Sequence, residues 1–77
     1  MGRAFNIVGR IEARAGSFTA IVCAVPWHGE LGAVHVHDCR SQRDAARLVD
    51  DLAQGLKAEL MSRGDLVLGI EVLGGAK

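Results

Sequence analysis

The chain has few of the residues on which disulfide-rich and nucleic-acid-binding domains depend. Its 77 residues include two cysteines, one proline, two phenylalanines, one tryptophan and no tyrosine. Two cysteines are too few for a disulfide framework, and so few aromatic rings cannot form a base-stacking platform. The formal net charge is zero, whereas phosphate binding requires a net basic face. Direct contact with nucleic acid is therefore not expected.

Long apolar runs are missing as well. No segment is long and apolar enough to be predicted as a membrane span. Arg3, Arg10, Glu12 and Arg14 interrupt the N-terminal region, where a secretory signal requires an uninterrupted apolar stretch. These absences predict a cytoplasmic protein whose thiols are reduced.

What the chain does contain is apolar sequence arranged in short periodic segments. Hydrophobic residues make up 49% of it, which indicates a folded domain, and its length allows only one, residues 1–77 with an ordered core at about 4–73. Phe5–Arg14 alternates between apolar and polar residues, and Phe18–Val25 is almost continuously apolar. Because a short turn at Ala15–Ser17 joins them, we predict an antiparallel hairpin. Gly32–Asp38 is predicted to be a third strand, antiparallel to the second.

A helix is predicted from about Ser41 to Arg63. Ser41 is a favourable N-cap, Asp44 follows three residues later, and Gly64 is suited to end the helix in a left-handed conformation. The stripe of apolar residues at helical spacing comprises Ala45, Leu48, Val49, Leu52, Leu56 and Leu60. Asp65–Leu73 is the last predicted strand. The predicted fold is therefore α+β with the order β-β-β-α-β, one mainly antiparallel sheet with a single helix packed on one face.

One helix can cover only one face of such a sheet. The second strand is apolar on both faces, and simple alternation in the last strand places Leu66, Leu68, Ile70 and Val72 on one side and Val67 and Leu73 on the other. Monomers rarely expose an apolar patch of this size, so we predict a homodimer or larger assembly in which a second copy covers the free face. The alternative is that irregular segments of the chain fold over it. The predicted interface residues are Ile21, Val25, Trp27, Val67 and Leu73.

The strongest candidate chemistry lies in the third strand. His35, His37 and Cys39 are spaced two apart and share a face on a regular strand. Imidazole and thiolate suit zinc or copper, and His28 or Cys23 can be considered as a fourth ligand. The alternative is that the three residues line a partly wet sheet face or a subunit interface. A small metal-binding module is therefore the second functional hypothesis.

Other chemistry has less support. Cys39 and His37 resemble a nucleophile and its base, but no third group orients such a pair. A chain this short also encloses little of a pocket, so we do not expect an enzyme. A third hypothesis, an accessory subunit that contacts nucleic acid, uses arginines of the first strand and of the helix start. Acidic residues are interleaved with these arginines, which is typical of ordinary surface charge.

Two motifs resemble HicB-like antitoxins. Phe18–Pro26 is similar to the family's second strand, which commonly ends in proline, and Ser41-Gln42-Arg43-Asp44-Ala45 is similar to the pattern that opens its helix. The resemblance implies a partial ribonuclease-H-like fold without nuclease residues, dimerisation, and binding to a small toxin protein. Two features differ from the family. Trp27–Gly32 replaces its glycine-rich loop, and no DNA-binding segment is found in this sequence, so the resemblance does not extend to operator binding.

Overall fold

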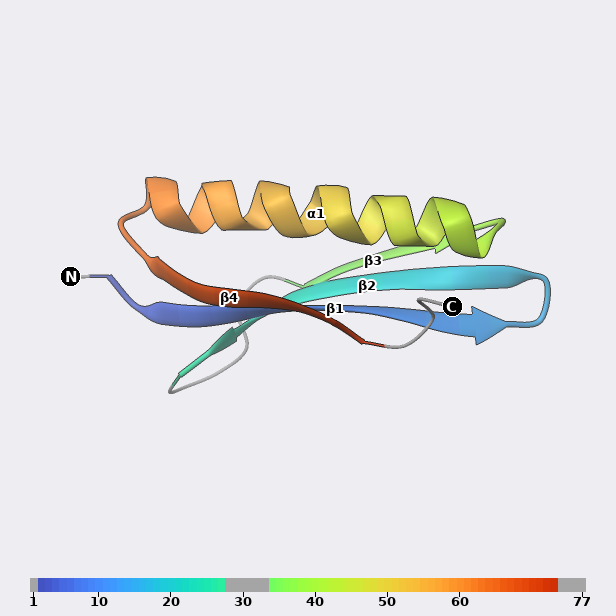
Figure 1. Ribbon diagram of the computed structural model, residues 1–77, viewed down its shortest axis with the longest axis horizontal. Coiled ribbons are helices and arrows are strands. Elements are labelled where there is room, and N and C mark those ends of the chain that lie inside the picture. The colour runs from blue at the N-terminus through green and yellow to red at the C-terminus, as the bar shows by residue number, and fades with distance from the viewer. Residues whose placement is uncertain (1, 28–33, 74–77) are drawn as a thin grey trace.

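One helix lies along one face of a four-stranded sheet (Figure 1). The elements in chain order are β1 (Ala4–Arg14), β2 (Ser17–Pro26), β3 (Val34–Cys39), α1 (Gln42–Ser62) and β4 (Leu66–Leu73). The computed structural model describes residues 2–27 and 34–73. The predicted start of the third strand at residues 32–33 lies outside the described residues. The β-β-β-α-β order confirms the predicted α+β fold.

The strands follow the order β3-β2-β1-β4 across the sheet. β1 pairs antiparallel with β2, β2 pairs antiparallel with β3, and β4 pairs parallel with β1. The hairpin between β1 and β2 turns at Gly16, whose φ of 78° is in the left-handed region that glycine adopts without strain. The sheet is thus mixed but mostly antiparallel, and β3 and β4 form its two edges.

Both ends of α1 are capped as the sequence predicts. The Ser41 Oγ accepts a hydrogen bond of 3.1 Å from the Asp44 N–H at the helix start. At the other end Gly64 has a φ of 86°, and the Asp65 N–H donates to the Leu60 carbonyl at 3.0 Å. This pattern is a Schellman motif, which satisfies a carbonyl that would otherwise lack a partner. No helix in the described part of the chain is long and apolar enough to cross a membrane.

The core lies between α1 and the facing side of β1 and β2. Its buried residues are Phe5, Ile7, Ile11, Ala20, Val22, Ala24, Ala45, Val49, Ala53, Leu56 and Leu60. The helical members include most of the predicted apolar stripe, with Leu48 and Leu52 only partly buried at its border. Small residues such as Ala53, which the predicted stripe did not include, lie where α1 approaches the sheet.

A register shift in β4 changes which of its residues face the helix. Phe5 pairs with Val67, but Asn6 pairs with Gly69, so Leu68 is an extra residue in β4. Such a bulge breaks the alternation of the side chains. Val67, Ile70 and Val72 therefore share the side of the sheet that faces α1, and the strict alternation predicted for this strand is wrong.

Candidate functional site

No element of the described chain covers the side of the sheet opposite α1 (Figure 1). We call this side the outer face. Directly paired residues of neighbouring strands point to the same side of a sheet, so the register identifies the residues of the outer face. Four rows of at least three residues cross it: Gly69, Asn6 and Val25; Glu71, Val8, Cys23 and Val34; Leu73, Arg10, Ile21 and Val36; and Glu12, Thr19 and Asp38.

The middle of the outer face is apolar over three strands. We call this region the outer patch, and its residues are Val8, Ile21, Cys23, Val25, Val34 and Val36. Val34 and Val36 are 51% and 58% exposed on the edge strand β3. The other four are half-buried by their neighbours within the sheet. Because the described chain supplies no layer over these side chains, their remaining apolar surface is available to another molecule.

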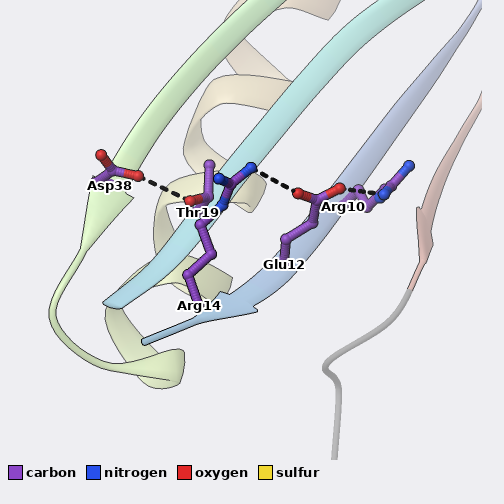
Figure 2. A network of polar contacts seen from close by, with 5 residues as sticks. All are labelled: Arg10, Glu12, Arg14, Thr19 and Asp38. Atoms are coloured by element: carbon purple, nitrogen blue, oxygen red, sulfur yellow. Dashed lines mark hydrogen bonds and ion pairs between the residues drawn. The ribbon is translucent and has the colours of Figure 1, made fainter. Parts of the chain in front are cut away.

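A network of polar side chains borders the outer patch near the β1–β2 turn. Glu12 forms ion pairs with Arg10 and, at 3.1 Å, with Arg14. The Thr19 hydroxyl donates to Asp38 Oδ1 at 2.8 Å and thereby ties β3 to β2. Figure 2 shows these side chains on one side of the sheet, with α1 behind the strands. The network marks the polar boundary of the outer patch.

Most of the predicted interface residues lie on the outer face or at its end. Ile21, Val25 and Leu73 belong to it by register. Trp27 follows β2 directly, is 69% exposed, and its N–H donates to the Ala4 carbonyl at 3.0 Å. Val67 does not belong to the outer face, because the bulge in β4 turns it toward α1, where it packs against the core.

His35, His37 and Cys39 share a face, but the described residues do not gather them into a cluster of metal ligands. The register places them beside Val22, Ala20 and Phe18 on the side that faces α1. Among residues 2–27 and 34–73, no three His, Cys, Asp or Glu side chains gather closely enough to hold a metal ion. The physical reason is the extended strand, which separates alternate side chains by about 7 Å at their base.

Of the two predicted fourth ligands, the structure places only Cys23, and it does not complete such a site. Cys23 points to the outer face, on the opposite side of the sheet from the two histidines. His28 lies outside the described residues. The same register separates the two free thiols, with Cys23 on the outer face and Cys39 on the helix face, where it packs against the core.

The arginines of β1 offer little to a phosphate backbone. Arg10 and Arg14 both pair with Glu12, so the three charges sum to a single positive charge. Nucleic-acid binding depends on several unneutralised cations along one face. The geometry of this part of the outer face therefore gives the nucleic-acid hypothesis no support.

The predicted interface residues do not include Val34 and Val36, which are the most exposed residues of the outer patch. The signal for them was present in the sequence. Alternation that places His35 and His37 on one side of β3 also places the two valines on the other side. Comparisons with protein-family models, curated proteins and solved structures find no match to this chain. The resemblance to HicB-like antitoxins therefore stays a prediction.

Proposed function

We propose that this chain is a non-enzymatic interaction domain that self-associates, with the outer patch of one copy packed against that of a second. The observation that supports this proposal is an apolar surface extending over β1, β2 and β3 with no covering layer in the described chain. Two sheets commonly pack face to face, with the facing side chains forming a shared core.

A second copy is favoured over a charged partner by the charge distribution. The six residues of the outer patch are uncharged, and Arg10, which lies beside Ile21 on the same face, is ion-paired with Glu12 of its own strand. The chain as a whole has a formal net charge of zero, so two copies do not repel each other over long distances. An isologous interface requires the same surface on both subunits, and a purely apolar patch satisfies that requirement.

The oligomeric state tests the proposal. We expect sedimentation equilibrium to give a mass above that of one 8.2 kDa chain. Val36→Lys, on the outer patch, should lower the mass because burying an unpaired ammonium group is unfavourable. His37→Lys adds the same charge to the same strand on the opposite face and should leave the mass unchanged. A monomeric wild type at high concentration, or equal masses for all three proteins, overturns the proposal.

The two cysteines provide a second measurement on the same surface. Cys23 lies in the outer patch and Cys39 on the helix face, and both are free and half-buried. Self-association should slow the alkylation of Cys23 as protein concentration rises. The rate for Cys39 should not depend on concentration. Circular dichroism of the Val36→Lys and His37→Lys variants separates loss of association from loss of fold.

The resemblance to HicB-like antitoxins extends the proposal to a second kind of partner, a small toxin protein. It is supported by the β-β-β-α-β order and by the capped helix that begins after Ser41. The test is co-expression with the product of a short neighbouring reading frame. A stoichiometric complex that survives size-exclusion chromatography supports this extension, and separate elution of the two proteins contradicts it.

A further inference from the structure

We infer that the free edge of β4 is a second self-association surface, on which the β4 strands of two copies pair antiparallel. This edge interface is distinct from the outer patch and does not depend on it. Every residue of Leu66–Leu73 except Val67 is exposed, although six of the eight are large and apolar. An edge strand with this composition and exposure is prone to pair with another strand.

Packing on the outer face alone cannot cover this strand. Leu66 and Leu73 lie on the outer face and are 60% and 44% exposed. Ile70 and Val72 lie on the opposite side, facing α1, and are 36% and 50% exposed. A partner that buries both pairs must approach β4 from its edge, where a paired strand contributes side chains to both faces.

The free edge of β4 also lacks most of the usual features that prevent such pairing. Natural edge strands are commonly protected by lysine, proline, inward charges or bulges. Leu66–Leu73 contains neither lysine nor proline, and Glu71 is its one charged residue. Its bulge at Leu68 leaves Gly69–Leu73 in uninterrupted register with β1. The other edge strand, β3, is shorter and carries Asp38 fixed to Thr19, which makes it a poorer template.

A second copy of β4 fits this edge because the strand is compatible with itself. In the antiparallel register centred on Ile70, this residue faces Ile70 of the second copy, and Glu71 faces Gly69. Moving the centre to Glu71 places two carboxylates directly opposite each other, which is unfavourable. The Ile70 register therefore pairs the apolar side chains and keeps the two glutamates apart. It also joins the two sheets into one and places Ile70 and Val72 of both copies in one strip between the two helices.

Disulfide trapping tests this register directly. In a Cys23→Ala/Cys39→Ala background, we expect Ile70→Cys to form an intermolecular disulfide under mild oxidation. Directly opposite residues of an antiparallel pair have Cα atoms about 4.5–5.5 Å apart, which is within disulfide range. The matched control is His37→Cys, since His37 is also exposed, also on the helix-facing side, and also in an edge strand. Equal crosslinking of the two variants overturns the inference.

Sedimentation of two lysine variants separates this inference from the proposed function. If both surfaces associate, Ile70→Lys leaves the assembly formed through the outer patch, and Val36→Lys leaves the assembly formed through the β4 edge. The double variant is then a monomer. If only the outer patch associates, Val36→Lys alone gives the monomer and Ile70→Lys has the wild-type mass. That result overturns the edge interface and leaves the outer-patch proposal standing. The converse result overturns the outer-patch proposal alone.

Discussion

Substituting alanine at two glycines, Gly9 and Gly55, should change stability in opposite directions. A Cβ at Gly9 is placed 2.5 Å from Val49 Cγ1, about 1 Å short of the ~3.5–4.0 Å that carbon atoms prefer. Val49 is 1% exposed, and a β-branched side chain in a helix has one strongly preferred rotamer, so it cannot turn away easily. Overpacking of this kind costs about 1–3 kcal/mol, which exceeds the roughly 0.5–1 kcal/mol gained by replacing glycine in a strand. Gly9→Ala should therefore destabilise the fold.

Gly55 is the matched control, because a Cβ there has nothing within 4 Å. It is exposed in the interior of α1, where alanine is favoured over glycine by about 1 kcal/mol. Thermal unfolding at fixed protein concentration should give a higher Tm for Gly55→Ala and a lower Tm for Gly9→Ala. Each kcal/mol corresponds to about 4–8 °C for a domain of this size.

A double-mutant cycle with Val49→Ala identifies the atom responsible. Val49→Ala removes Cγ1, so the methyl group added by Gly9→Ala then occupies the vacated space. In that background we expect Gly9→Ala to be neutral or stabilising. Destabilisation of equal size in both backgrounds would refute the assignment of the clash to Val49, and a stabilising Gly9→Ala in the wild type would refute the close approach of α1 to β1.

Three further substitutions test individual hydrogen bonds and backbone conformations by chemical denaturation. Asp38→Ala removes the acceptor of the Thr19 hydroxyl, which is 2% exposed, and should lower the free energy of unfolding by about 1–3 kcal/mol; an unchanged value contradicts the importance of this bond. Ser41→Ala removes the cap on the Asp44 N–H and should lower the free energy of unfolding by about 1 kcal/mol. Ser41→Asn keeps a capping side chain and should retain most of the wild-type stability. Gly64→Ala places a side chain at a φ of 86° and should cost about 1–2 kcal/mol, and Gly64→Asn should cost less.

The order of elements could be predicted from the sequence because each one has its own local signal. Alternation in Phe5–Arg14, the glycine of the hairpin turn, and the Ser41 and Gly64 caps of α1 depend only on neighbouring residues. The short turn between Phe5–Arg14 and Phe18–Val25 likewise predicted that β1 and β2 pair antiparallel. These features depend on backbone geometry and short-range periodicity, which can be recognised from neighbouring residues in the sequence.

The orientation of β4 could not be predicted, because it depends on a contact between distant parts of the chain. The bulge at Leu68 exists only relative to β1, and nothing in Leu66–Leu73 by itself marks which residue is unpaired. That one extra residue places Val67 on the same, helix-facing side of the sheet as Ile70 and Val72. The described residues give the metal hypothesis no support, for a related reason. The spacing of His35 and His37 fixes a shared face, but only the fold shows which groups stand nearby.

Both proposed surfaces exist because the single helix is too small to cover the whole sheet. One helix of 21 residues covers the middle of a four-stranded sheet, so the core forms over β1 and β2. Ile70 and Val72 on the helix-facing side of β4, and Val34 and Val36 on the outer face, remain exposed in the described chain. A chain of 77 residues has a small core and correspondingly little stability to spare. Association through either proposed surface is expected to stabilise the folded state by mass action, since only folded chains present a register and a continuous face. We therefore propose that the apolar residues of β4 and of the outer patch belong to a core that is completed between chains.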